Sequence, residues 1–324
     1  MEALLPLVLG SIKALVLLCL AAGITLALRH RAARVRAVVW GTAIAGCLVI
    51  PLVAPLLPTW TFPVPAALES FTIPAEPEVT VGVTLESTRI DETTTAVRLP
   101  ELTVNRSADS AFTVNWTLVF GGLWILGTAV LFIRLGIGSW RVRQALRTAH
   151  PIDDSTWQRL FDGALAKARC RRSVRLLWSE AVEVPATVGV LRPTVVLPPR
   201  AATWPYDRRR AVLLHEAIHV ARLDWPVRTI ARVARAVYWF NPLIWWAVRR
   251  LDLEQELACD EEVLALGTGA SDYACHLLGV ARHAMPTPSP AIPALGMARR
   301  THLEERIMTI LERTTHRRVG MAVL

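Results

Sequence analysis

The sequence predicts a mainly α-helical membrane protein that carries a small α+β domain. Of the 324 residues, 53% are hydrophobic and only 19% are charged, whereas a soluble domain has about 25% charged residues. Three apolar runs, at residues 4–28, 37–57 and 112–133, contain a single charged residue between them, Lys13. A helix needs about 20 residues to cross the hydrocarbon core of a bilayer. Each run is therefore long enough to form a membrane-spanning helix.

The first run could instead be a secretory signal peptide. Its length, and the lack of an A-x-A cleavage pattern before the basic stretch at residues 29–36, favour an uncleaved anchor. Lys13 must then face another helix or extend toward the interface.

The arginines predict which side of the membrane each segment faces. Four lie between the first two runs and four follow the third, whereas residues 58–111 hold eight acidic and three basic residues. Cytoplasmic segments are enriched in Lys and Arg. We therefore expect a multi-pass protein of the cell (inner) membrane with two transmembrane helices and a short basic cytoplasmic loop in residues 1–57, an extracytoplasmic loop at 58–111, a third transmembrane helix at 112–133 and a cytoplasmic domain at 140–315.

The net charge of +9 has two interpretations. All basic residues except Lys13 and Lys167 are arginines, and such a balance suits either nucleic-acid binding or the cytoplasmic face of a membrane protein. Because the arginines gather beside the apolar runs, we expect the lipid bilayer as a partner and no direct contact with nucleic acid.

The predicted cytoplasmic domain contains one motif that points to metal chemistry. Residues 207–221 have the pattern of a helix and include His215-Glu216-Ala217-Ile218-His219. Two histidines four residues apart lie on one helical face, where both imidazoles can reach one zinc ion at about 2.0–2.1 Å. Glu216 can then act as the general base. The alternative is a buried structural helix in which these polar side chains have no function, and they would then need other hydrogen-bond partners.

A third metal ligand is expected from a second helix, predicted from residue 242 to about residue 266. Glu256 and Asp260 lie four residues apart there. Glu256 could bind the metal while Asp260 accepts the free N–H of a ligand histidine. The alternative is an ordinary acidic, solvated helix face, since charge runs usually face water.

Four motifs in order resemble one known family. They are P-A-T-V-G-V-L-R-P-x-V-x-L-P at 185–198, H-E-A-I-H-V-A-R-x-D at 215–224, W-F-N-P-L-I-W at 239–245 and E-L-A-C-D at 256–260. This order is similar to that of the membrane-embedded gluzincin zinc peptidases typified by the β-lactam-sensing receptor-proteases. The layout of three apolar runs before the domain matches that family as well.

The resemblance implies a zincin-like metallopeptidase domain with Zn²⁺ as cofactor. It implies zinc ligands His215, His219 and Glu256, catalytic Glu216, and Asp260 as the partner of a ligand histidine. It also implies a cytoplasmic active site near the bilayer and protein substrates, often transcriptional repressors. A homodimer is one assembly that we consider.

The sequence departs from the receptor members of that family in two respects. It has no S-x-x-K, the motif of the penicillin-binding sensor, so sensing of β-lactams by this chain is not supported. A further span usually follows the peptidase domain, and residues 316–324 look like the start of such a span.

We therefore expect an integral-membrane zinc metalloendopeptidase that acts in signal-triggered regulation. The prolines bordering residues 185–198 favour a hairpin or edge strand. We expect an extended substrate to add to it at Val188, Gly189, Val190, Val195 and Leu197. Two alternatives stay open, a housekeeping protease for membrane-protein quality control and a non-catalytic signalling scaffold, although the presence of Glu216 argues against the scaffold.

Overall fold

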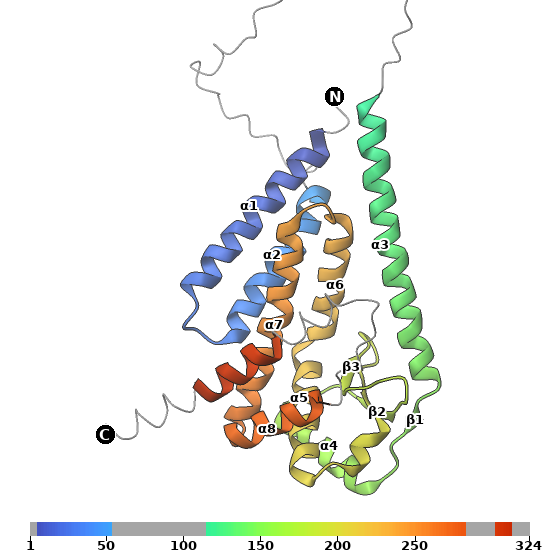
Figure 1. Cartoon of the computed structure of the whole chain (residues 1–324), viewed down its shortest axis with the longest axis vertical. Coiled ribbons are helices and arrows are strands. Elements are labelled where there is room, and N and C mark those ends of the chain that lie inside the picture. The colour runs from blue at the N-terminus through green and yellow to red at the C-terminus, as the bar shows by residue number, and fades with distance from the viewer. Residues whose placement is uncertain (1–4, 54–114, 283–301, 313–324) are drawn as a thin grey trace, which may run out of the picture. The chain divides into compact units, whose positions relative to one another are not determined.

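The computed structural model describes residues 5–53, 115–282 and 302–312 (Figure 1). The extracytoplasmic loop predicted at 58–111 and the possible further span at 316–324 lie outside the described residues. Within the described ranges the chain is mainly helical, with one small sheet.

Three apolar helices form where the sequence predicts them. They are α1 (Leu5–Ala27), α2 (Ala33–Val53) and α3 (Trp116–Arg147). Three stretches, Leu9–Ala27, Ala33–Ile50 and Trp116–Arg147, are long and apolar enough to cross a membrane. Helix α3 continues beyond the predicted end of the third run, because no proline interrupts it before Pro151. The start that we predict for the following domain, residue 140, thus lies inside α3.

A small mixed sheet follows α3. Its strands are β1 (His150–Pro151), β2 (Arg175–Trp178), β3 (Ala186–Val188) and β4 (Thr194–Leu197), in the spatial order β1-β2-β4-β3. Strand β4 pairs parallel with β2 and antiparallel with β3. The hairpin predicted at 185–198 is therefore confirmed as β3–β4, and β3 is the edge strand.

Five helices and a short helical segment complete the described part of the fold. They are α4 (Ser155–Lys167), α5 (Tyr206–Arg222), α6 (Asp224–Val237), α7 (Pro242–Ala265), α8 (Ala270–Ala281) and the segment 302–312. A 3₁₀ helix, η4 (Pro199–Thr203), links β4 to α5. The helices predicted at 207–221 and 242–266 are confirmed as α5 and α7. Asn241 caps α7 by accepting a hydrogen bond from the backbone N–H of Leu243 (2.9 Å).

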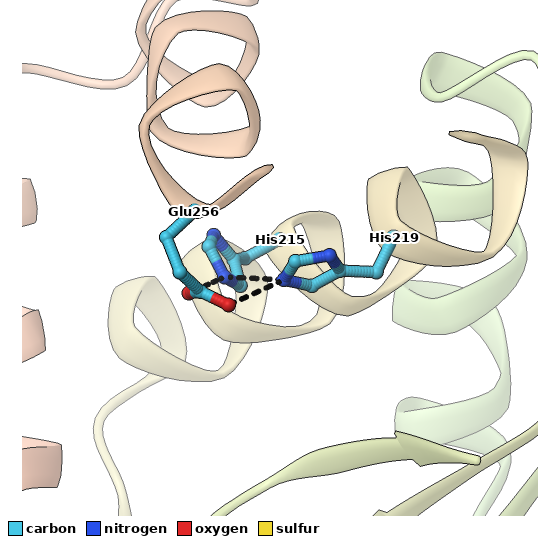
Figure 2. Close-up of side chains that lie close together, drawn as sticks. All are labelled: His215, His219 and Glu256. Atoms are coloured by element: carbon cyan, nitrogen blue, oxygen red, sulfur yellow. Dashed lines mark hydrogen bonds and ion pairs between the residues drawn. The ribbon is translucent and has the colours of Figure 1, made fainter. Parts of the chain in front are cut away.

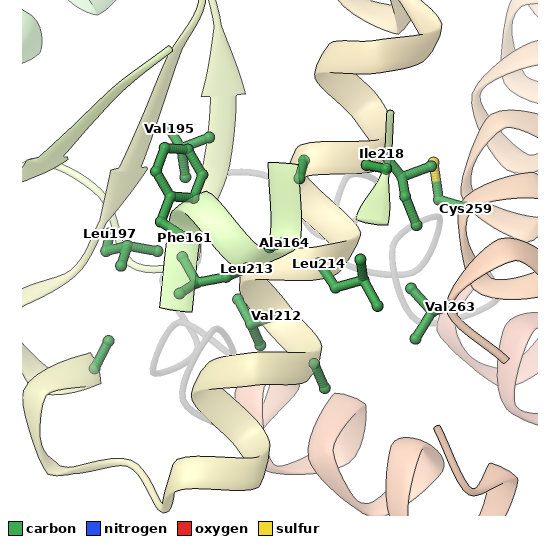
Figure 3. Close-up of a cluster of buried hydrophobic side chains, with 14 of the residues drawn as sticks. Phe161, Ala164, Val195, Leu197, Val212, Leu213, Leu214, Ile218, Cys259 and Val263 are labelled. Carbon is green, nitrogen blue, oxygen red and sulfur yellow. The ribbon is translucent and has the colours of Figure 1, made fainter. Parts of the chain in front are cut away.

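Helix α5 runs through the centre of the main hydrophobic core. All of its residues from 211 to 220 are buried, and they pack against α4, β4 and α7 (Figure 3). A helix that is apolar on most sides has to be covered on most sides. The surrounding elements supply that cover, and the two histidines of α5 are thereby fixed inside the fold.

The position of β4 corrects one prediction. Val195 and Leu197 are fully buried in the main core, and β4 is paired on both of its sides. Neither side chain can contact an added substrate strand, and β4 offers no unpaired edge. Only the β3 end of the hairpin, with Val188, Gly189 and Val190, keeps the position that substrate addition requires.

Candidate metal centre

The two histidines of α5 meet at their Nε2 atoms. His215 and His219 are one helical turn apart and are buried, with 8% and 7% of their surface exposed. Their Nε2 atoms are 3.1 Å apart, so both rings aim at one point beside the helix.

Glu256 of α7 completes this group from the opposite side. One carboxylate oxygen lies 3.5 Å from His215 Nε2 and the other lies 3.5 Å from His219 Nε2 (Figure 2). One ligand atom from each of the three residues falls within 4.8 Å of the others. The structure thus brings together the three residues that the resemblance implies as ligands.

Asp224 orients His219 from behind. Its Oδ2 lies 2.7 Å from His219 Nδ1, and this side chain is almost completely buried. Burial raises the pKa of Asp224. The contacts with His219 and Arg222 lower the pKa by more than burial raises it, so the pKa lies below the ordinary value. An ionised Asp224 accepts the Nδ1–H, which leaves the Nε2 lone pair available for a metal.

A tight turn places Asp224 beneath its histidine. Helix α5 ends at Leu223, which adopts a left-handed conformation (φ 59°), and α6 starts at the next residue. The reversal brings Asp224 back against the last turn of α5. Asp224 is the last residue of the motif at 215–224, but its spacing from the two histidines did not predict that it would be a hydrogen-bond partner of His219.

His215 has a different partner from the one expected. The Tyr273 hydroxyl of α8 lies 2.9 Å from His215 Nδ1 and donates to Asp260 Oδ1 over 2.7 Å. The direct distance from His215 Nδ1 to Asp260 is 3.4 Å, which is long for a hydrogen bond. Asp260 therefore lies where we predicted it, but Tyr273 bridges it to the imidazole. No motif or spacing in the sequence pointed to Tyr273.

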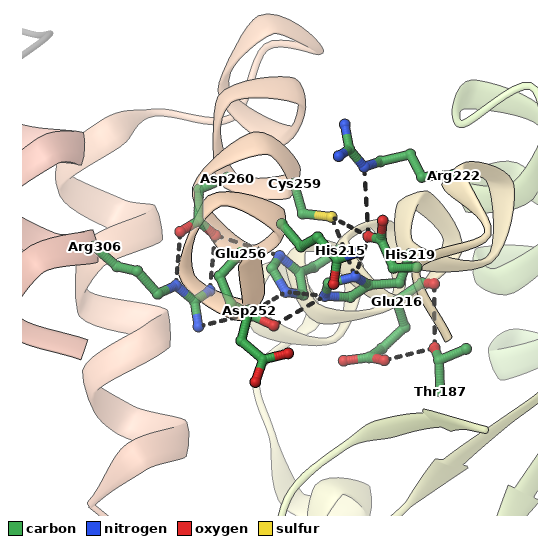
Figure 4. A network of polar contacts seen from close by, with 12 residues as sticks. Thr187, His215, Glu216, His219, Arg222, Asp252, Glu256, Cys259, Asp260 and Arg306 are labelled. Carbon is green, nitrogen blue, oxygen red and sulfur yellow. Dashed lines mark hydrogen bonds and ion pairs between the residues drawn. The ribbon is translucent and has the colours of Figure 1, made fainter. Parts of the chain in front are cut away.

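Two arginines neutralise the acidic pair on α7. Arg306, from segment 302–312, donates two hydrogen bonds to Asp260 (2.7 and 2.8 Å) and lies 3.0 Å from Glu256 (Figure 4). Arg228 of α6 donates to the other Glu256 oxygen (2.6 Å). Burial raises the pKa of Glu256, but Arg306 and His219 bring it well below the usual range. The carboxylate is thus ionised, as a metal ligand must be.

Glu216 occupies the position next to the histidines that a general base requires. It is buried, and one of its carboxylate oxygens accepts a 2.7 Å hydrogen bond from the Thr187 hydroxyl. Thr187 belongs to the edge strand β3. A small cavity at this place is lined by Thr187, Gly189, His219, Leu223 and other neighbours. Thr187 therefore contacts the candidate base and also borders this cavity, which Glu216 itself does not line.

The donor set fits a catalytic zinc ion. Two imidazole nitrogens and one carboxylate oxygen, with a fourth position left for water or substrate, are the ligands of several zinc hydrolases. A second group, His219, Asp224 and Cys259, also lies within ligand distance. In that group Asp224 Oδ2 lies 2.7 Å from His219 Nδ1 and 3.6 Å from Cys259 Sγ, so the protein already holds this carboxylate. Asp224 therefore serves as the orienting partner of His219.

A buried H-E-x-x-H helix that meets an acidic residue of a second helix is an arrangement typical of metallopeptidases. Comparison with known proteins gives the particular family. The model of the family described as BlaR1 peptidase M56 matches residues 5–310, and the chain belongs to this family.

Individual relatives are similar over shorter stretches. The regulatory protein BlaR1 of Bacillus licheniformis is 30% identical over 145 residues, which is 45% of this chain and 24% of that relative. Methicillin resistance mecR1 proteins of Staphylococcus aureus and Staphylococcus epidermidis are each 25% identical over 97 residues, 30% of this chain and 17% of the relative. The aligned part of the chain thus spans about a quarter or less of the length of these relatives.

Proposed function

We propose that this protein is an integral-membrane zinc metalloendopeptidase that cleaves protein substrates at the cytoplasmic face of the membrane. One observation carries the proposal. The Nε2 atoms of His215 and His219 and the carboxylate of Glu256 converge from two helices, while Asp224 and Tyr273 hold the opposite ring nitrogens.

The residues of the chain divide the chemistry between them. Zinc held by His215, His219 and Glu256 would polarise the scissile carbonyl and activate a water molecule. Glu216 takes the proton of the attacking water and delivers it to the leaving amine. Thr187 fixes one oxygen of that carboxylate, so that the base has a defined direction before substrate arrives.

An extended substrate segment would pair with the free edge of β3. This strand supplies Thr187 to the site, and the residues after it turn at Gly189 (φ 95°) toward the cavity next to His219. Backbone pairing of this kind gives affinity without a strict sequence requirement. Val188, Gly189 and Val190 are the residues that we propose to contact the substrate.

We further propose that the cleavage serves signal-triggered regulation, with a cytoplasmic transcriptional repressor as the substrate class. Support comes from the family, whose relatives carry the names regulatory protein and methicillin resistance protein.

The proposal is tested by comparing Glu216→Gln with Glu262→Gln, a matched change on α7 outside the cluster. In the purified full-length protein, both variants and the parent should hold one zinc ion per chain, whereas His215→Ala should lose most of it. Proteins that accumulate uncut in cells carrying Glu216→Gln, and not in cells carrying Glu262→Gln, identify the substrates.

Two results would overturn the proposal. A chain that binds no zinc, with His215→Ala indistinguishable from the parent, would exclude a metallopeptidase. Zinc binding together with identical proteomes in the Glu216→Gln and Glu262→Gln cells would instead indicate a scaffold without catalysis.

A further inference from the structure

A second hydrophobic core joins the catalytic half of the chain to the apolar helices. It contains residues of α1 and α2 together with residues of α6 and α7, among them Leu18, Trp40, Ala234 and Ile244. The hairpin formed by α6 and α7 thus packs against helices that are long and apolar enough to cross a membrane.

Helix α7 runs antiparallel to α2 along most of its length. Three contacts establish the register: Ala33 N–H donates to Glu261 (3.2 Å), Arg36 pairs with Glu254 (2.7 Å), and the Trp40 and Trp246 rings meet edge to face (5.1 Å). The first of these is at the basic end of α2. Each later contact lies deeper along α2 and nearer to the start of α7.

The turn between α6 and α7 lies farthest along α2. The Tyr238 hydroxyl donates to the backbone carbonyl of Cys47 (2.8 Å), which is about 21 Å from Ala33 at ~1.5 Å per residue. If α2 crosses a hydrocarbon core of about 30 Å, the turn reaches roughly two-thirds of the way across it.

The composition of the turn suits a hydrocarbon environment. Residues 236–248 contain no charged side chain and are bordered by Arg235 and Arg249. Phe240 and Trp246 are each 44% exposed. Arg235 lies over the Trp245 ring (4.9 Å), and long side chains such as those of Arg232 and Arg249 can extend toward the interface.

Several backbone groups of the turn are hydrogen-bonded to protein groups, as non-helical backbone at membrane depth requires. Trp124 of α3 donates its indole N–H to the carbonyl of Val237 (3.0 Å), and Trp245 donates to the carbonyl of Trp239 (2.8 Å). Trp239 in turn donates to the carbonyl of Trp124 (3.4 Å). Asn241 N–H donates to the carbonyl of Tyr238 (2.9 Å). Indole groups thus take the place that water has in an exposed turn.

Helix α3 approaches this turn as closely as glycine allows. A Cβ atom at Gly127 would lie 2.3 Å from the Trp239 ring. Residues of α1, α2 and α3 therefore all pack on the α6–α7 hairpin or its turn.

We propose that the α6–α7 hairpin is a re-entrant membrane element whose turn, residues 238–241, enters the hydrocarbon core. The hairpin contacts lipid chains through Phe240 of the turn and Trp246 of α7. The hairpin enters from the side that carries the metal centre and does not cross. Helix α7 then joins the two environments, because Glu256 lies about 21 Å along it from Pro242, near the basic end of α2.

The test measures the depth of a nitroxide label attached to a single cysteine. Phe240→Cys and Trp246→Cys are made in the full-length chain with Cys19, Cys170 and Cys275 replaced by alanine, and the protein is reconstituted in phosphatidylcholine–phosphatidylglycerol vesicles. Cys47 and Cys259 are buried and are retained, so the introduced cysteine is the accessible one, and the parent with the three replacements is the labelling blank. Both positions are partly exposed, so the label needs no cavity. Leu191→Cys, at a position 89% exposed on the β3–β4 turn, is the matched control.

Labels at Phe240 and Trp246 should collide at least several-fold more with oxygen than with a water-soluble nickel chelate, and the label at Leu191 should show the reverse. Both hairpin labels meeting the nickel chelate as freely as Leu191 does would overturn the proposal. The measurement needs no peptidase activity, so its outcome is independent of the proposed function.

Discussion

At the scale of single residues, the two candidate ligand histidines are held by different chemistry. His219 has a buried carboxylate directly on its Nδ1, whereas His215 has a tyrosine hydroxyl backed by Asp260. An ionised carboxylate fixes the tautomer and raises the basicity of the ligand more strongly than a neutral hydroxyl does. Asp224 is therefore the partner whose loss should matter most for metal binding.

Replacing Asp224 with alanine should lower zinc affinity about 10–100-fold, the usual cost of removing the partner of a ligand histidine. Tyr273→Phe should have a smaller effect, because the hydroxyl it removes is neutral. Zinc affinity is measured by competition with a chelator in the purified protein. Asp162→Ala, an exposed change on α4, is the control, and equal affinities for Asp224→Ala and Asp162→Ala would contradict the assignment.

Arg306 should be the residue of segment 302–312 on which stability depends most. Removing one partner of a buried ion pair typically costs about 3–5 kcal/mol, because the other charge stays buried and unpaired. Arg306→Ala leaves the buried Asp260 without its arginine, while Glu256 keeps Arg228, and it should lower the melting temperature of the zinc-free protein.

The control for Arg306 lies on the same segment. Glu305 pairs with Arg250 at 3.3 Å, but both groups are more than a third exposed, and such pairs contribute about 0–1 kcal/mol. Glu305→Ala should therefore melt close to the parent. If Arg306→Ala and Glu305→Ala have the same melting temperature, the buried ion pairs around Asp260 do not contribute to stability.

The sequence could predict part of this centre and not the rest. His215, Glu216 and His219 follow from spacing on one helix, and Glu256 was a candidate from its spacing to Asp260 on a second helix, which the resemblance then supported. Tyr273 and Arg306 come from elements that approach α7 only in the folded chain, and nothing in their local sequence marks them. The position of Asp224 beside His219 depends on the left-handed backbone conformation of Leu223. Because non-glycine residues rarely adopt that conformation, the sequence did not predict the turn.

At the scale of elements, the order of strands in the sheet could not be predicted from local sequence patterns. The bordering prolines predicted the β3–β4 hairpin correctly, but they could not tell which strand lies outside. Strand β2 pairs parallel with β4 across a long connection, and this pairing depends on tertiary contacts that the local sequence does not encode. The pattern of β4 did carry a signal, since its continuous apolar run is typical of a strand buried on both faces.

The pairing of α2 with α7 depends on a buried charge as well as on apolar packing. Arg36 contacts Glu254, which is 1% exposed and also contacts Arg250 (3.2 Å). We expect the single changes Arg36→Ala and Glu254→Ala each to destabilise the protein and the double change to cost less than their sum. A coupling energy of about 0.5–3 kcal/mol is typical for contacting residues. Strictly additive shifts in melting temperature would show that the two side chains do not interact.

At the scale of the whole molecule, the peptidase part is not a separate body attached to the apolar helices. The described residues 5–53, 117–282 and 302–312 belong to one compact unit, and α7 supplies side chains both to the core with α1 and α2 and to the candidate metal centre. A shift of α2 would move the helix that carries Glu256. The Arg36–Glu254 ion pair joins α2 to this helix two residues from Glu256.

The orientation of this unit in the membrane is the last prediction. Arginines lie at the α1–α2 connection and along the last part of α3, whereas residues 58–111 contain eight acidic and three basic residues. Because cytoplasmic segments carry the excess of Lys and Arg, the metal centre should face the cytoplasm. Alkaline phosphatase, active only outside, should be active when fused after Glu78 and inactive after Thr203, and a green fluorescent reporter should give the opposite result. Signals from the same side at both positions would reject this orientation, and phosphatase activity after Thr203 would also reject a cytoplasmic repressor as the substrate.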